Sequence, residues 1–174
     1  ESMRIGDPSD EKTDLGALIS ADHLRKVERY IELAKEEGGT ILTGGYPHLP
    51  EKFSNGNWIA PTVISGLGVD SRCSTEEIFG PVVSIHRFSD DSEAIEIANN
   101  TRYGLAGSVW TSDVGRGRMI ADSIHTGMVW INTWLHRDLR VPFGGVGDSG
   151  VGREGGKGSL GFFSEATNVC VKHD

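Results

Sequence analysis

The sequence predicts an α/β fold in which helices and strands form layers. Three observations support this class. Expected strands and helices alternate through the middle of the chain, residues 20–37 have the spacing of an amphipathic helix, and Met128–Asn132 is a continuous apolar run. A strand that is apolar at every position is typical of a parallel sheet buried on both faces.

Composition and charge limit the possible classes of protein and of binding partner. The 174 residues are 37% hydrophobic and 24% charged, which predicts one globular domain with a core. The net charge of −8 argues against binding to nucleic acid or to an anionic membrane. No apolar run is long enough to span a bilayer, and the first residues show no secretory signal. Two distant cysteines indicate neither a disulfide framework nor a metal site, so we expect a reducing cytoplasm.

The first half of the chain predicts one long helix and two strands. The helix begins near Ser20–Asp22 and ends at Gly38–Gly39. Its buried face is expected to carry Leu24, Val27, Tyr30, Ile31 and Ala34. Strands are expected at Thr40–Thr43 and at 58–64, where Pro61 favours an edge or a strand end. The segment around Cys73 is expected to be a turn.

The second half continues the alternation of strands and helices. A short helix should be capped by Asp91 and a longer one by Asp113, and Gly127 should end the second. A strand at Asn168–Lys172 would need an edge to pair with, its own or a partner's. The remaining expected elements are strands at 82–88, 105–111 and 128–132 and a helical turn at 159–163.

A pair of carboxylates next to an aromatic ring stands at residues 76–81, with the sequence E-E-I-F-G-P. An ionised carboxylate can accept hydrogen bonds from both hydroxyls of a ribose, and a neighbouring ring could pack on a planar base. From these residues alone the alternative is favoured, namely a solvated glutamate pair and a core phenylalanine.

Four ordered motifs resemble the NAD(P)-dependent aldehyde dehydrogenase superfamily. They are E-E-I-F-G-P-V at 76–82, N-T-R-Y-G-L-A-G at 100–107, G-M-V-W-I-N at 127–132, and P-F-G-G followed by S-G-V-G-R-E between 142 and 154. The resemblance implies the C-terminal portion of a catalytic domain, with a mostly parallel sheet and helices on its faces, over residues 1–158. Residues 159–174 would add a helical turn and an oligomerisation strand.

The same resemblance implies a cofactor site. Glu77 would bind the ribose on the nicotinamide side, with Glu76 as the alternative contact, and Phe79 would pack near the nicotinamide ring. NAD is the expected cofactor and NADP the second choice. The glycine-rich run at 144–158 lacks the strand, helix and acidic residue of a dinucleotide fingerprint, so we interpret it as a structural crossing.

The segment Asn132–Phe143 would line the aldehyde channel. Its sequence is similar to that of the 2-hydroxymuconic and 2-aminomuconic semialdehyde dehydrogenases. Arg137 matches a position that is expected to bind a substrate carboxylate in those enzymes. A guanidinium binds carboxylates through two parallel hydrogen bonds. Trp134, Leu135 and Phe143 are candidate pocket residues. The alternative is that Arg137 or Arg140 pairs with Asp138 at the surface.

Catalysis in this family needs a cysteine thiolate and a general-base glutamate. Neither Cys73 nor Cys170 stands in the nucleophile motif, so we expect the nucleophile, the base and the dinucleotide domain before residue 1. The 174-residue chain alone is therefore predicted to be inactive. Expected partners are a small semialdehyde and further copies of the chain, as a dimer or tetramer. The alternative is a non-catalytic folding or oligomerisation module, or a structural relative.

Overall fold

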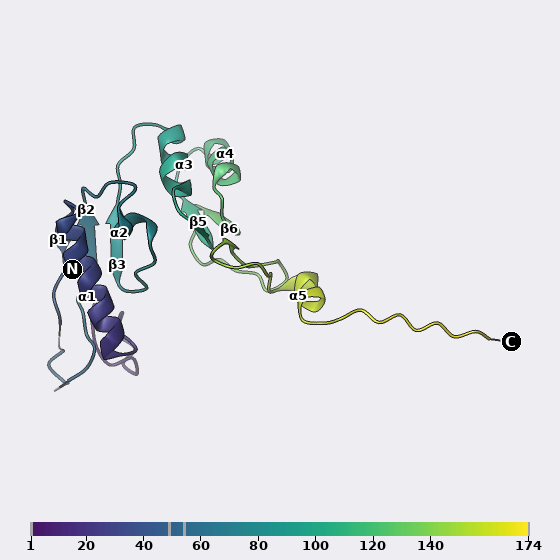
Figure 1. Cartoon of the computed structure of the whole chain (residues 1–174), viewed down its shortest axis with the longest axis horizontal. Helices are drawn as coiled ribbons and strands as arrows, with labels where there is room; N and C mark the ends of the chain where they lie inside the picture. Colours follow the sequence, from purple (N-terminus) through teal and green to yellow (C-terminus); the bar gives the residue numbers. More distant parts are fainter. Residues whose placement is uncertain (1, 49, 54, 174) are drawn as a thin grey trace. The chain divides into compact units, whose positions relative to one another are not determined.

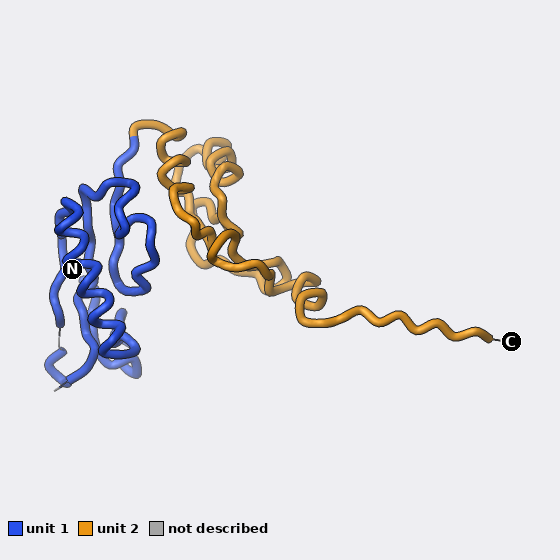
Figure 2. Tube along the Cα trace, in the orientation of Figure 1, with its two compact units in different colours: residues 1–88 blue, residues 89–174 orange. Residues whose placement is uncertain are grey.

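The computed structural model describes residues 2–48, 50–53 and 55–173 (Figure 1). The chain forms two compact units, Glu1–Phe88 and Ser89–Asp174, which Figure 2 shows in different colours.

Helix α1, Ala21–Glu36, is the main helix of the first unit and lies where the apolar spacing predicts it. Ser20 caps it by accepting a hydrogen bond from the His23 backbone N–H at 3.1 Å. Gly38 follows the helix with a φ of 86°, a conformation that glycine adopts without strain. Val27, Ile31 and Ala34 are buried, as predicted for the apolar face.

A three-stranded mixed sheet packs against α1. Strands β1 (Thr40–Thr43), β2 (Thr62–Ser65) and β3 (Val82–Ile85) lie in the order β1-β2-β3. The first pair is antiparallel and the second is parallel. The strand predicted at 58–64 begins later, because Pro61 has no N–H to donate to a ladder. Ile59 instead forms an isolated bridge with Pro47.

A short helix between β2 and β3, α2 (Arg72–Thr75), corrects the prediction of a turn around Cys73. Ser71 caps it, and both oxygens of the Glu37 carboxylate accept hydrogen bonds from its first N–H groups, at 3.2 and 3.4 Å. Four residues are too few to show helical periodicity, so sequence spacing could not reveal this element.

Two clusters of buried side chains form the core of the first unit. One joins α1 to the segments before β2 and β3, and consists of Val27, Ile31, Ile59 and Ile78. The other joins the end of α1 to the sheet and α2, and consists of Ala34, Ile64, Leu67 and Cys73. Ile78 belongs to the loop at 76–81, so this loop is anchored in the core.

The second unit alternates helices and short strands. Its elements are α3 (Asp91–Asn99), β4 (Tyr103–Gly104), β5 (Ala106–Val109), α4 (Val114–Ser123), β6 (Met128–Ile131), β7 (Val146–Gly147) and α5 (Gly156–Phe162). Strands β5 and β6 are parallel, and β4 pairs antiparallel with β7. Asp113 caps α4 as predicted. Asp90 caps α3 in place of Asp91, whose carboxylate pairs with Arg116.

The prediction of an α/β fold is confirmed, but that of a mostly parallel sheet is wrong for the described residues. Three small sheets contain two parallel and two antiparallel pairs. Strand β6 is parallel to its neighbour, yet only Trp130 among its residues is buried. A continuous apolar run predicts a strand, but the burial of its two faces depends on which elements cover them.

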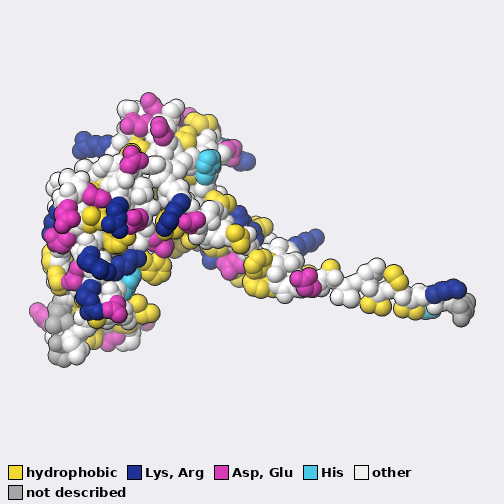
Figure 3. Space-filling model, in the orientation of Figure 1, with side chains coloured by type: hydrophobic (Ala, Val, Ile, Leu, Met, Phe, Trp, Pro, Cys, Tyr) yellow, Lys and Arg dark blue, Asp and Glu magenta, His cyan; other side chains and the backbone are white. Residues whose placement is uncertain are grey.

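The C-terminal segment is extended and exposed. Asn168–Lys172 forms no strand, which corrects the prediction of one, because these residues pair with no edge in the described chain. The side chains of Val169 and Val171 are 78% and 69% exposed, and Figure 3 shows apolar side chains along this tail. Pairing with a partner's edge stays a prediction. Among the described residues, no helix is long and apolar enough to cross a membrane.

Candidate functional site

The loop at 76–81 presents an aromatic side chain to solvent from a buried anchor. Ile78 is 8% exposed and packs in the core, whereas the next residue, Phe79, is 73% exposed. The backbone of Phe79 has a φ of 58°, the left-handed conformation, which costs a residue with a side chain about 1–2 kcal/mol. The expected core phenylalanine, the alternative that the residues alone favoured, is therefore wrong.

The two glutamates of this loop have different surroundings. The Glu76 carboxylate accepts hydrogen bonds from Arg72 Nε and Nη2 at 2.9 and 3.0 Å, and from the Tyr30 hydroxyl at 2.6 Å. The Glu77 side chain is exposed, and it has no hydrogen bond or ion pair with any described residue. Glu77 is thus the carboxylate of the pair that can accept hydrogen bonds from a ligand.

Helix α1 hydrogen-bonds the backbone of the same loop. Lys26 Nζ donates to the Glu77 carbonyl at 3.0 Å. His23 Nε2 donates to the Phe79 carbonyl at 2.5 Å, and the two rings meet edge to face with centroids 5.9 Å apart. These contacts stabilise the left-handed backbone of Phe79. Sequence reasoning missed both residues, although their spacing along the helix places them on one face.

A hollow of about 350 Å³ adjoins the loop on the side of β3. Phe79 lines it together with Val82, Val83 and His86, and the His86 ring lies 3.2 Å from the Ser74 hydroxyl. Glu76 also lines this hollow, whereas Glu77 does not. The exposed Phe79 ring offers an apolar face beside it, on which a planar group can stack.

Neither cysteine has the surroundings of a nucleophile. Cys73 is 5% exposed, and its thiol donates to the Tyr30 carbonyl at 3.3 Å. Burial, together with the nearby Glu37 carboxylate, raises the pKa of the Cys73 thiol to about 11. Cys170 lies in the exposed tail, where the Asn168 amide is 3.6 Å from its sulfur.

In the second unit, the structure brings Arg137 and Phe143 together. The Arg137 guanidinium carbon lies 4.0 Å from the centre of the Phe143 ring, a cation–π contact. Arg137 Nη2 also donates to the Glu154 carboxylate at 2.6 Å. Phe143 and Glu154 are themselves joined by two backbone hydrogen bonds of 2.8 Å. Three distant positions in the sequence therefore form one cluster, and sequence reasoning missed the role of Glu154 in it.

The other two predicted pocket residues, Trp134 and Leu135, are both exposed. Trp134 is 59% exposed and packs edge to face on Trp130, with centroids 5.1 Å apart. Leu135 is 61% exposed, and its φ of 54° is again left-handed. Trp130 Nε1 donates to the His136 carbonyl at 2.8 Å, which ties this segment to β6.

The sequence left open whether Arg137 or Arg140 pairs with Asp138, and the ion pairs of the structure distinguish the two. Arg140 donates to the Asp138 carboxylate from both Nε and Nη2, at 2.9 and 2.6 Å, so the surface pair expected for one of them is Arg140–Asp138. Arg137 pairs with Glu154 instead. Its side chain is 37% exposed, against 89% for Arg140.

The glycine-rich run packs backbone against backbone, as a structural crossing should. A Cβ on Gly144 would lie 2.3 Å from the Gly152 carbonyl oxygen. The Arg153 guanidinium donates to the carbonyls of Gly145 and Gly152 at 2.7 and 2.8 Å. Carbonyls that face a cation in this way cannot form a phosphate cradle, which needs N–H groups directed at the ligand.

Comparison with known proteins agrees with these motifs. The model of the aldehyde dehydrogenase family matches residues 1–169. The chain belongs to the aldehyde dehydrogenase family. It is 48% identical to a 2-aminomuconic 6-semialdehyde dehydrogenase from a Pseudomonas species, over 100% of this chain and 36% of that protein. It is 46% identical to a 2-hydroxymuconic semialdehyde dehydrogenase of Pseudomonas putida, over 99% of this chain and 36% of the relative.

Solved aldehyde dehydrogenases share the fold. A putative aldehyde dehydrogenase from Burkholderia cenocepacia superposes with a TM-score of 0.89 at 42% identity, covering 94% of this chain and 34% of that one. Betaine aldehyde dehydrogenase of Staphylococcus aureus in complex with NAD+ gives 0.89 at 38% identity, over 93% and 32% of the two chains. This aldehyde dehydrogenase chain spans about a third of the length of the relatives that it matches.

Proposed function

We propose that this chain takes part in the NAD-dependent oxidation of a carboxylate-bearing semialdehyde, of the 2-hydroxymuconic or 2-aminomuconic type, to the corresponding acid. The muconic semialdehyde dehydrogenases among its relatives support the substrate class. The observation that carries the proposal is the loop at 76–81, where the Glu77 carboxylate and the Phe79 ring are both exposed two residues apart.

The residues of this loop fit the ribose and nicotinamide of NAD. The Glu77 carboxylate has no partner among the described residues, so both of its oxygens can accept hydrogen bonds from vicinal hydroxyls. The exposed Phe79 ring would pack beside the planar nicotinamide. When bound, NAD+ supplies the acceptor for the hydride that leaves the aldehyde carbon. The protein groups orient this acceptor and exclude water from one side of it.

Arg137 is the proposed contact for the far carboxylate of the substrate. The Phe143 ring and the Glu154 carboxylate position its guanidinium. Of the guanidinium nitrogens, Nη2 donates to Glu154. The other N–H groups of the fork can donate to a substrate carboxylate. Phe143 would then serve both as an apolar wall and as a support for the arginine. Trp134 and Leu135 are proposed as further apolar contacts of the substrate.

Changing Glu77 to glutamine tests the cofactor site in the full polypeptide that carries this chain. We expect the KM for NAD+ to rise about five- to tenfold, because a neutral amide replaces a charge-assisted acceptor. Steady-state kinetics at varied NAD+ measures this change. Glu36→Gln, at the exposed end of α1, is the matched control and should leave the KM unchanged. Unaltered NAD+ affinity and hydride transfer in Glu77→Gln would refute the ribose assignment.

We further propose that the 174-residue chain has no dehydrogenase turnover by itself. With a pKa of about 11, the Cys73 thiol is ionised in roughly one molecule per thousand at pH 8, and it is buried. Cys170 lies in an exposed tail, where the Asn168 amide is the hydrogen-bonding neighbour of its sulfur. NADH absorbance with a semialdehyde substrate should stay flat. Turnover that is lost on Cys73→Ser or Cys170→Ser would overturn this expectation.

Residues 1–158 are proposed as part of the catalytic domain, and residues 159–174 as an oligomerisation segment. Val169 and Val171 stand two residues apart and are both exposed, which supports pairing of this segment with the sheet edge of another copy. The same observation favours the second candidate function, a non-catalytic folding or oligomerisation module. Glu77→Gln separates the two, since a module without cofactor chemistry would be indifferent to it. The cytoplasmic location stays a prediction of the sequence.

A further inference from the structure

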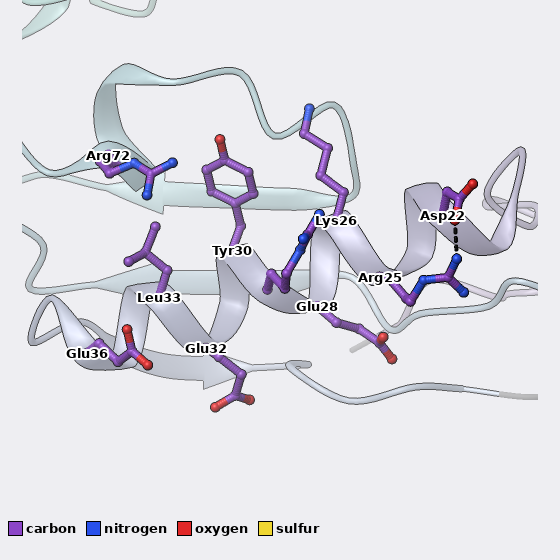
Figure 4. A pocket seen from close by; sticks show the side chains of 10 residues that line it. Asp22, Arg25, Lys26, Glu28, Tyr30, Glu32, Leu33, Glu36 and Arg72 are labelled. Carbon is purple, nitrogen blue, oxygen red and sulfur yellow. Dashed lines mark hydrogen bonds and ion pairs between the residues drawn. The ribbon is translucent and has the colours of Figure 1, made fainter.

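One face of α1 is directed at the loop that carries Glu77. His23, Lys26 and Tyr30 are spaced by three and four residues, so their side chains lie on the same side of the helix. Figure 4 shows Lys26 and Tyr30 rising from one side of α1 with Arg72 beside the Tyr30 ring, while Glu28, Glu32 and Glu36 point to the other side. All three α1 residues contact the loop, two through its backbone and Tyr30 through Glu76.

The contact through Glu76 joins three elements. Arg72 from α2 donates two hydrogen bonds to the Glu76 carboxylate, and Tyr30 from α1 donates a third. Arg72 also lies over the Tyr30 ring at 6.0 Å from its centre. The hydrogen bond to Glu76 raises the pKa of the Tyr30 hydroxyl, because the carboxylate stabilises the protonated phenol. The Glu76 carboxylate is therefore engaged on both of its oxygens.

The backbone conformation of Glu76 bears on the side to which the Glu77 side chain points. Glu76 ends α2 with φ −102° and ψ 152°, an extended conformation. In an extended segment, successive side chains point to opposite sides. With the Glu76 side chain bound to α1 and α2, alternation would place the Glu77 side chain on the side away from them, which agrees with the exposure of Glu77.

We propose that Tyr30 and Arg72 are positioning residues, which bind Glu76 and thereby direct Glu77 toward the cofactor ribose. This inference rests on the proposed function of Glu77. It assigns different roles to the two glutamates: Glu76 belongs to the scaffold of the loop, and Glu77 contacts the ligand. The left-handed Phe79, whose backbone costs energy, depends on the same face of α1 through His23.

The test uses Tyr30→Phe and Arg72→Gln in the full polypeptide. Each variant removes donors to Glu76, and Tyr30→Phe keeps the ring that packs on the core. We expect the KM for NAD+ to rise about three- to tenfold with kcat at saturating NAD+ within about twofold, because the loss falls on cofactor binding. Tyr46→Phe and Arg29→Gln are the matched controls, since both residues lie exposed in the same unit and should leave the KM unchanged.

A double-mutant cycle separates positioning from general destabilisation. If Tyr30 acts through Glu77, Tyr30→Phe should raise the KM for NAD+ no further in a Glu77→Gln background. Equal effects of Tyr30→Phe in both backgrounds would overturn the inference. If Glu77→Gln alone has no effect, the ribose assignment itself fails. If Glu77→Gln raises the KM while Tyr30→Phe and Arg72→Gln match their controls, only the positioning role is refuted.

Discussion

Alanine at Gly127 is expected to destabilise the unit formed by residues 89–174 by about 3 kcal/mol or more. Gly127 lies between α4 and β6, and its N–H donates to the Gly104 carbonyl at 3.0 Å. A Cβ added there would lie 1.6 Å from the Gly144 carbonyl oxygen and 2.7 Å from its carbon. These atoms belong to backbone, so the clash can be relieved only by moving the glycine-rich crossing away from β6.

Urea unfolding followed by tryptophan fluorescence measures this effect, since Trp110, Trp130 and Trp134 all lie in the same unit. The control is Gly161→Ala in α5, where an added Cβ meets no atom within 4 Å. That change should be neutral or slightly stabilising, because alanine has the higher helix propensity. Equal stability of Gly127→Ala and Gly161→Ala would show that the crossing does not approach β6 as closely as described.

Replacing Arg137 by alanine in the full polypeptide is expected to raise the KM for a carboxylate-bearing semialdehyde roughly tenfold to 100-fold. The lost interaction is a charge-assisted pair, worth about 1.5–3 kcal/mol. The change also frees Glu154 and the Phe143 ring, which Arg137 contacts at 2.6 and 4.0 Å. An unpaired Glu154 carboxylate would then repel an anionic substrate, which adds to the loss.

Two controls define the result for Arg137. Arg140→Ala removes an equal charge from the same segment, but its partner is Asp138 and its side chain is 89% exposed. It should change the KM little. A neutral aldehyde should be oxidised by Arg137→Ala with nearly the original KM. Comparable losses with the neutral aldehyde would indicate a defect in folding and would contradict a carboxylate contact.

Local signals made much of the fold predictable. The spacing of Val27, Ile31 and Ala34 predicts α1 and its buried face, and Ser20 and Gly38 mark its two ends. Asp113 marks the start of α4 in the same way. Helix α2 escaped prediction because four residues show no period. The strand predicted at 168–172 is absent, because a strand requires an edge to pair with and this segment pairs with none in the described chain.

The candidate site was predictable as a set of motifs but not as an arrangement. The order of the motifs identifies Glu77, Phe79 and Arg137 as candidates. It leaves Glu76 open as the alternative to Glu77, and it does not predict that Arg137 pairs with Glu154 and Arg140 with Asp138. Partners that lie 17 or 46 residues away in the sequence leave no local pattern.

By itself, the sequence determined the family, the α/β class and the helices and strands whose side-chain periods and caps are local. Only the tertiary structure decided which carboxylate is bound by its neighbours and which is exposed. The physical reason is that Glu76 and Glu77 are chemically identical, so their difference comes from surroundings. Tyr30 on α1 and Arg72 on α2 meet Glu76 because the chain folds those elements together. Glu77, the next residue, is exposed and has no such side-chain partner among the described residues.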